Sequence, residues 1–369
     1  MGIDLRLTIL AVPPVLPAIH HDLTMSEAAV GALTGLPVLI LGAAAIGGSL
    51  LISHVGARRA WIVGLLIVAF AGAARGAGPS LAMLFAMTFV MGVGVAVCQP
   101  AAPTIVGEWL PRSIGFATAV YVNGLLVGET LGAALTIPFV LPLLHSSWEL
   151  SLVFWSVPVL LTVVVLTLAT QNAPVHELQR ANWWPNWRDG YMWQLGIVQA
   201  SASVIYWGAN AFIPDYLHAL GKPGLVAPSL SVLNLGQLPV SFATLFFADR
   251  LAGRRDVLVV TGMVAACGLA LFVFAPQALA LTGIGLVGAA TSFTMVMVLA
   301  VLPMVAAQHD VARLTAGVLT LSYGGTFLGN FLSGVLWDAT HAPLAAWVPL
   351  FAGVMGLIVT SAFLRKTVP

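Results

Sequence analysis

Two ionisable side chains lie inside long apolar runs of this sequence, and they are the residues most able to do chemistry there. Arg6 lies in the first run. If that run crosses a membrane, a charge at its centre costs roughly 2.5 to more than 10 kcal/mol unless it meets water, a partner or a ligand. Arg6 could bind a substrate anion with its planar guanidinium, or it could extend to lipid headgroups. Asp4, close to Arg6, favours the first interpretation.

Glu129 is the acidic residue that lies well inside a later apolar run. Burial favours the protonated form of a carboxyl, so Glu129 could exchange a proton during a transport cycle. The alternative is a protonated or hydrogen-bonded Glu that is packed among small residues. Gly124, Gly128 and Gly132 repeat every fourth residue around it, which predicts a flat helix face that a second helix approaches closely.

A set of neutral polar and aromatic side chains also lies within the apolar runs. Tyr206 and Asn210 are one helical turn apart and therefore share a helix face. Such side chains could form the wall of a site for a planar solute and fix its orientation, or they could bond one helix to another. The candidate substrate-binding set is Arg6, Gln99, Asn123, Tyr206, Trp207, Asn210, Asn234, Gln237 and Tyr323, with Asn330 as a further amide.

Motifs of enzymes and of nucleotide-driven pumps are absent from the sequence. It has no His-x3-His, no paired carboxylates within the runs and no Gly-x4-Gly-Lys-Ser/Thr. Cys98 and Cys267 both lie in apolar runs, where they are expected to be small buried side chains. We therefore expect no catalytic residue, no metal site and no cofactor. Arg75 and Asp215 are interpreted as gate or loop charges near the outer ends of their runs.

The composition is that of a membrane protein. Hydrophobic residues make up 60% of the chain and charged residues only 7%, against about 25% in soluble domains. A net charge of +1 gives no footprint for a nucleic acid. Runs long enough to span a bilayer predict an all-α polytopic fold of about twelve transmembrane helices. They lie near 3–19, 28–52, 60–77, 80–106, 115–144, 150–170, 191–217, 227–248, 257–275, 278–307, 314–337 and 345–364.

Basic residues predict how the chain is oriented. With the N-terminus inside, only Arg75 and Lys222 of the 14 Lys and Arg residues fall on the outer side, and Arg6 lies within the first span. The prediction is a multi-pass protein of the inner membrane with both termini cytoplasmic. The first span is short and interrupted by Pro13, Pro14 and Pro17, which leaves open that part of this helix precedes Met1. No cleavable signal peptide is evident.

A long-period repeat divides the chain into two halves. Pro17 and Pro214, like Gly56 and Gly253, are separated by 197 residues, and Arg58 maps onto Arg255 at this offset. Two halves of one hydrophobic chain are typical of secondary transporters, and here the copies are predicted to be parallel. Each copy is expected to run from an outer proline turn to an inner basic turn. The predicted domains are 1–170, a cytoplasmic linker at 171–190 with interfacial tryptophans, and 191–369.

The basic turns carry a family resemblance. Asp249-Arg-x-x-Gly-Arg-Arg255 resembles the loop between the second and third helices of each half in the major facilitator superfamily, and Ser53-His-x-Gly-x-Arg-Arg59 resembles a degenerate first copy. The resemblance implies two six-helix bundles and a charge lock at these loops. The residues of the lock would be Ser53, Arg58, Arg59, Asp249, Arg250, Arg254 and Arg255. Asp is usual in the family at the position of Ser53, so the first half of the lock is the weaker one.

Within that superfamily, shorter stretches resemble the cyanate permease and 2-nitroimidazole transporter family. They are Asp4-Leu-Arg-Leu and the proline run to Ile19, Gly92-Val-Gly-Val with Gln99, and Leu235-Gly-Gln237. The resemblance implies a carrier that moves a small anion or compact heterocycle by alternating access, and we expect a monomer and proton-coupled uptake. An efflux carrier of the same fold is one alternative. A membrane sensor or receptor derived from a carrier is the alternative from another class.

Overall fold

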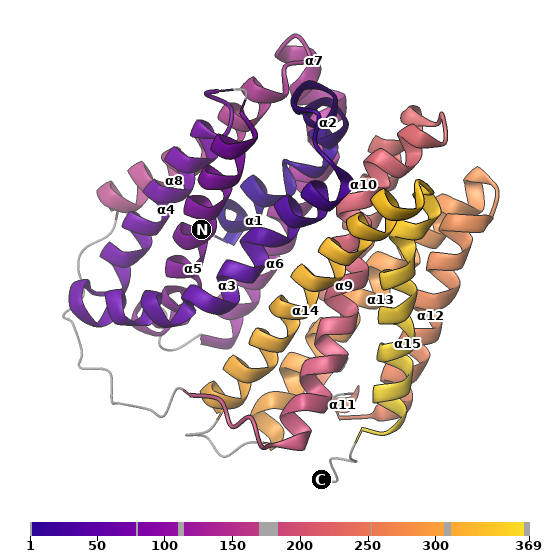
Figure 1. Cartoon of the computed structure of the whole chain (residues 1–369). Coiled ribbons are helices and arrows are strands. Elements are labelled where there is room, and N and C mark those ends of the chain that lie inside the picture. The colour runs from indigo at the N-terminus through magenta and orange to yellow at the C-terminus, as the bar shows by residue number, and fades with distance from the viewer. Residues whose placement is uncertain are drawn as a thin grey trace. The chain divides into compact units, whose positions relative to one another are not determined.

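The structure, a computed structural model, is helical throughout the part of the chain that it describes (Figure 1). It describes residues 2–78, 80–109, 114–169, 184–251, 253–305 and 311–364. Within these ranges, the side chains of 44–54, 100–104, 106–109, 114–119, 122, 169, 245–250, 303 and 311–313 lie outside the description.

The chain forms two compact units. Unit 1 comprises Met1–Met25 and Leu36–Gln179, and unit 2 comprises Ser26–Gly35 and Arg180–Pro369. The first turns of α3 therefore group with unit 2, where the Asp338 carboxylate accepts hydrogen bonds from the backbone N–H groups of Glu27 (3.0 Å) and Ala28 (2.8 Å). A carboxylate at a helix N-terminus satisfies donors that have no partner within the helix.

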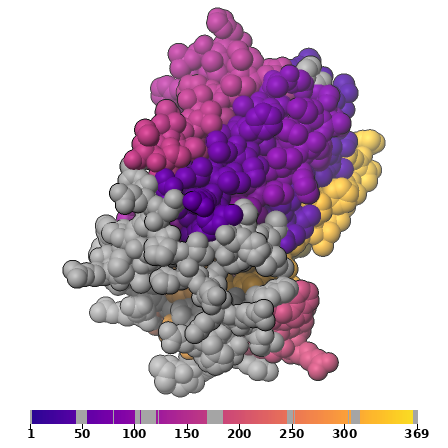
Figure 2. All heavy atoms as spheres, turned by 90° about the vertical axis from the view of Figure 1, so that its left-hand side faces the viewer, coloured from indigo at the N-terminus to yellow at the C-terminus, as the bar shows by residue number. Residues whose placement is uncertain are grey.

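The helices of unit 1 follow the apolar runs closely. They are α1 (Gly2–Leu10), η1 (Pro13–Val15), α2 (Leu16–Leu23), α3 (Glu27–Val55), α4 (Ala57–Ala74), α5 (Leu81–Trp109), α6 (Ile114–Leu135), the π-helical turn η2 (Thr136–Val140), α7 (Leu141–Leu143) and α8 (Trp148–Ala169). Figure 2 shows one face of the molecule, on which the described atoms of unit 1 are coloured indigo to magenta. Large apolar side chains such as Phe70 and Leu168 are exposed on α4 and α8, as expected where helices meet lipid.

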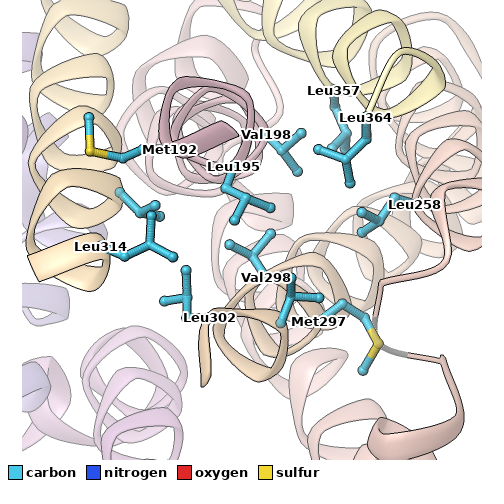
Figure 3. Packing of buried hydrophobic residues seen from close by; sticks show 12 residues of the cluster. Met192, Leu195, Val198, Leu258, Met297, Val298, Leu302, Leu314, Leu357 and Leu364 are labelled. Carbon is cyan, nitrogen blue, oxygen red and sulfur yellow. The ribbon is translucent and has the colours of Figure 1, made fainter. Parts of the chain in front are cut away.

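Unit 2 contains the remaining helices. They are α9 (Gly190–Ala219), η3 (Pro223–Leu225), α10 (Val226–Leu235), α11 (Gln237–Leu251), α12 (Arg255–Phe274), α13 (Gln277–Val305), α14 (Val311–Thr340), η4 (Pro343–Trp347) and α15 (Val348–Ala362). A cluster of buried side chains from α9, α12, α13, α14 and α15 packs its interior (Figure 3). Leu195, Val298 and Leu357 are members of this cluster and are fully buried.

The predicted spans are confirmed as membrane-length helices. Among the described residues, nine segments are long and apolar enough to cross a bilayer, and the described part of α3 adds a shorter apolar helix. The 30-residue helices α9 and α14 are less apolar but, at about 1.5 Å per residue, long enough to cross as well. The predicted linker 171–190 lies largely outside the described residues, which resume at Trp184. Asp189 then caps α9 by accepting from the Tyr191 N–H.

The 197-residue repeat is visible in the helix starts. α4 and α12 begin at Ala57 and Arg255, α5 and α13 at Leu81 and Gln277, and α6 and α14 at Ile114 and Val311, which are separations of 198, 196 and 197 residues. Neighbours within each unit match too: α1 packs on α6 as α9 packs on α14, and α4 packs on α5 and α8 as α12 packs on α13 and α15. Gly56 (φ 83°) and Gly253 (φ 79°) share the left-handed backbone that glycine favours.

The predicted proline turns are wrong. Pro17 lies in the first turn of α2 and Pro214 lies inside α9, because a proline near a helix start replaces a donor that has no partner there, and neighbouring helices tolerate one further along. The break in the first span lies earlier, where Pro13 and Pro14 separate α1 from α2 by the short helix η1.

Candidate functional site

The glycine face of α6 places α1 within unit 1. A Cβ atom added at Gly128 would overlap the Ile3 carbonyl oxygen, and one at Gly132 would lie 2.7 Å from the Leu7 carbonyl oxygen. The two helix backbones are therefore in direct contact. The spacing of the glycines predicted such a contact but did not say which helix would make it. The neighbour is α1, the helix that carries Arg6 (Figure 1).

This contact brings together the two charged residues that sequence analysis considered separately. Arg6 Nε lies 3.5 Å from Glu129 Oε1, and the two side chains are only 13% and 6% exposed. Glu129 follows Gly128 directly, so the closest approach of the helices coincides with the ion pair. A buried pair is stable only while both partners remain, because loss of one leaves a buried charge.

Asp4 belongs to the same helix but has another partner. Its Oδ1 accepts a hydrogen bond from Thr162 Oγ1 of α8 at 3.1 Å, and the residue is 3% exposed. One face of α1 thus bonds to α8 while Arg6 pairs with α6. This gives α1 a fixed rotation about its own axis.

In unit 2, four of the predicted polar residues form one buried network. Tyr206 Oη donates to Asn234 Oδ1 (2.6 Å) and accepts from Gln237 Nε2 (3.0 Å). Asn234 Nδ2 donates to Asn210 Oδ1 (2.9 Å) and to the Leu230 carbonyl oxygen (2.8 Å). The network joins α9, α10 and α11, and it holds the Tyr206 ring against Trp207 in an edge-to-face contact with centroids 5.6 Å apart.

A local irregularity of the chain lets α10 and α11 present these amides. Asn234 lies in the last turn of α10 and Gln237 begins α11, with Gly236 between them. Pro239 has no N–H to donate to the Leu235 carbonyl, so the helical hydrogen bonding is interrupted at this point. Interrupted helices often supply polar groups to binding sites in transporters.

The other predicted binding residues are placed individually. Gln99 on α5 and Asn123 on α6 are half-buried in unit 1. Tyr323 and Asn330 on α14 are buried in unit 2, where Asn330 Nδ2 donates to Thr34 Oγ1 at 3.5 Å.

The predicted lock residues are described in part. Arg58 donates from one terminal nitrogen to the Leu166 and Thr167 carbonyl oxygens at the end of α8 (3.2 and 3.0 Å), and Arg59 is exposed. In unit 2, Arg254 pairs with Asp256 at 2.6 Å, which raises the pKa of Arg254, and Arg255 is exposed. The side chains of Ser53, Asp249 and Arg250 lie outside the description.

Two residues that were interpreted as gate or loop charges have buried side chains. Arg75 is 1% exposed and donates to the Thr8 carbonyl oxygen of α1 at 2.8 Å. Asp215 is 7% exposed on α9, and its carboxylate lies within 4.8 Å of that of Glu27, also in unit 2. Both positions lie at the edge of apolar runs, where sequence alone does not distinguish an exposed charge from a buried one. For Arg75 the sequence held one signal of burial, the pair Pro13–Pro14. Prolines leave backbone carbonyl oxygens without helical donors, and a buried side chain can supply the missing donor.

Comparison with known proteins places the chain among membrane carriers. The sequence model of the Major Facilitator Superfamily matches residues 5–289. The cyanate transport protein CynX of Escherichia coli (strain K12) is 26% identical over 97% of this chain and 94% of its own length. The 2-nitroimidazole transporter of the same organism is 25% identical over 96% and 91%. The crystal structure of a D-xylose–proton symporter has the same fold, with a TM-score of 0.80 at 14% identity over 100% of this chain and 95% of that one.

Proposed function

The chain belongs to the Major Facilitator Superfamily and is a transporter rather than an enzyme, and from this premise we propose that it carries a small anion that binds Arg6. The observation that supports the proposal is the buried pair of Arg6 with Glu129. Its relatives transport cyanate, an anion, and 2-nitroimidazole, a flat ring with a polar nitro group. The cyanate anion and the nitro group both carry delocalised negative charge, and a planar guanidinium donates hydrogen bonds well to such acceptors.

Competition for Arg6 couples the anion to a proton. Glu129 pairs with Arg6 in the structure. When an anion takes its place, the Glu129 carboxylate remains in a low-dielectric environment without its cation, and protonation then becomes favourable. One proton is therefore taken up with each anion, and the pair crosses the membrane without net charge. This arrangement makes the carrier a proton-coupled importer when the outer side is the more acidic one.

Unit 2 contains a separate group of uncharged polar and aromatic side chains. Tyr206 and Trp207 are buried aromatic residues in contact with one another, and Asn234, which bonds to Tyr206, also bonds to Asn210. Such a network fixes the rings without using charge, which suits the recognition of a flat solute. We assign Tyr206 to the recognition of a neutral solute within unit 2, and Arg6 to the binding of the anion within unit 1.

The proposed orientation follows the basic residues. Arg58, Arg59, Arg254 and Arg255 lie on the cytoplasmic side of an inner membrane, and both termini are cytoplasmic. One chain is the working unit, because it contains both halves of the repeat.

The test is cyanate binding to purified protein as a function of pH. With one proton taken up per anion, the Kd rises about tenfold for each unit of pH while Glu129 is ionised in the free protein. Arg6→Ala abolishes binding. Glu129→Gln, which resembles the protonated residue, binds cyanate without dependence on pH and no longer accumulates it in proteoliposomes under a proton gradient.

Three outcomes contradict parts of this proposal. If 2-nitroimidazole stabilises wild type and Arg6→Ala equally while cyanate stabilises neither, the solute is not an anion at Arg6. If the pH dependence survives in Glu129→Gln but is lost in Asp215→Asn, the proton binds at the carboxylates of Glu27 and Asp215. If accumulation requires an acidic interior, the carrier works as an exporter.

A further inference from the structure

The break between α1 and α2 leaves one carbonyl of α1 without its helical donor. In a continuous helix the Val12 N–H would bond to the Thr8 carbonyl oxygen, four residues earlier. Here Val12 N–H donates to the Ile9 carbonyl oxygen instead, at 3.4 Å, because the chain tightens ahead of Pro13. The Thr8 carbonyl is left buried at the end of α1, where it needs another donor.

Arg75 supplies that donor from another helix. Its terminal nitrogen lies 2.8 Å from the Thr8 carbonyl oxygen, and the whole side chain is buried at 1% exposure. Within the part of the chain that the structure describes, this is the one hydrogen bond of the Arg75 side chain, and its Nε is buried without a partner. Burying an arginine side chain without a carboxylate partner costs free energy. The hydrogen bond to the Thr8 carbonyl is the contact that offsets this cost and fixes the position of the guanidinium.

The second half of the chain provides an internal comparison. At the offset of 197 residues, Arg75 corresponds to Phe272, which packs against Trp347 with ring centroids 5.1 Å apart. The helix that corresponds to α1 is α9, which runs without a break from Gly190 to Ala219. The unit with the broken helix has the arginine, and the unit with the continuous helix has an apolar side chain. This correlation is expected if the arginine serves the break.

We propose that Arg75 is a positioning residue for solute binding: it caps the Thr8 carbonyl and so holds the end of α1 that presents Arg6. Arg6 lies two residues before Thr8 on the same short helix. Asp4 and Gly128 of α6 contact the first turn of α1, whereas Gly132 and the hydrogen bond from Arg75 hold its last turn. The assignment rests on the proposed role of Arg6, but the state of the helix end can be measured independently of it.

The experiment compares Arg75→Met with Arg75→Lys, which keeps a donor for the carbonyl, and with Phe272→Met as the matched control from unit 2. Amide hydrogen exchange of residues 8–16 reports the helix end, and cyanate binding reports Arg6. In Arg75→Met we expect exchange about tenfold faster and a Kd about 10-fold to 100-fold weaker, as when a partner that orients a ligating residue is lost. Arg75→Lys restores both to within about threefold of wild type. Phe272→Met lowers the melting temperature but leaves both readouts unchanged.

The possible results separate the two proposals. Weaker binding in Arg75→Met with unchanged exchange, or an equal loss of binding in Phe272→Met, overturns the positioning role. If Arg6→Ala binds cyanate like wild type, the proposed function fails, and the exchange of residues 8–16 still decides whether Arg75 holds the helix end. If Arg75→Met does not fold, Arg75→Lys decides alone: faster exchange and a Kd ten times weaker despite the retained donor contradict the proposal.

Discussion

The two halves of the chain use the same helix contact for different purposes. In unit 1, Gly128 and Gly132 of α6 meet the backbone of α1 at Ile3 and Leu7; in unit 2, Gly325 and Gly329 of α14 meet the side chains of Ala200 and Val204 on α9. All four pairs obey the offset of 197 residues. The positions of Arg6 and Glu129 are taken by Ser203 and Thr326, which bond to the hydroxyl and the carbonyl of Ser322.

The two halves share the helix contact and differ in the polar side chains beside it. Small residues at the helix contact are common to both halves and belong to the packing. Among the described residues, the buried pair of Arg6 and Glu129 lies in the half where backbone meets backbone, and the neutral amide network lies in the other. The buried ion pair and the buried amide network thus lie in different repeats, each built on the same scaffold.

The largest effect is expected when Arg6 and Glu129 of unit 1 are replaced by the residues found at the same positions of unit 2. Glu129→Thr alone leaves Arg6 buried without its carboxylate, and we expect a loss of about 3–5 kcal/mol in the free energy of unfolding. Arg6→Ser together with Glu129→Thr regains most of that loss but does not bind cyanate. Thermal unfolding in detergent and cyanate binding give the two readouts. A double variant less stable than Glu129→Thr would contradict the assignment.

A smaller effect distinguishes the two glycine contacts. Gly128→Ala pushes a methyl group into the Ile3 carbonyl, and because backbone yields little we expect a cost of about 1–3 kcal/mol. Gly325→Ala is the matched control, since its methyl meets the Ala200 side chain, and it should cost less. Melting temperatures compare the two. Equal losses would mean that the closeness of α1 to α6 is not specific to unit 1.

The neutral network offers a third comparison. Tyr206→Phe removes the donor to Asn234 and the acceptor for Gln237, which leaves buried polar atoms unsatisfied at a cost of about 1–2 kcal/mol. We expect weaker binding of 2-nitroimidazole but little change in the pH dependence of cyanate binding, because Glu129 is untouched. A lost pH dependence in this variant would show that the two repeats do not divide their roles.

The smallest expected effect concerns the basic turns. Arg58→Met removes a cation that caps the carbonyls at the end of α8, which is worth about 0.3–1 kcal/mol. Arg255 is its counterpart at the same offset and is exposed, so Arg255→Met should leave the melting temperature unchanged. The comparison fails if the two variants lose the same stability.

Sequence was sufficient for the frame because the frame depends on composition and period. Long apolar runs predict spans wherever they occur, and the anchors Gly56 and Gly253 revealed the repeat, so helix positions and family followed without coordinates. The glycines at 124, 128 and 132 predicted a close helix but not its identity, since a flat face accepts any neighbour. For that reason Arg6 and Glu129, 123 residues apart, were assigned separate roles although they form one pair.

Burial at the helix ends could not be predicted in the same way. Arg75 and Asp215 lie where hydropathy falls, and a sequence pattern gives the same signal for a loop and for a helix end packed among neighbours. The proline turns at Pro17 and Pro214 were wrong for a related reason: tertiary contacts satisfy the carbonyls that proline leaves, and the helix forms around it.

One short connection limits how the helices of unit 1 can move. α3 ends at Val55 and α4 begins at Ala57, so the left-handed Gly56 is the whole link between them. Another residue there would be strained by about 1–2 kcal/mol, and no slack remains for the two helices to swing apart at this end. We therefore expect the joined ends of α3 and α4 to move together. Conformational change during transport would then occur at other connections of the chain.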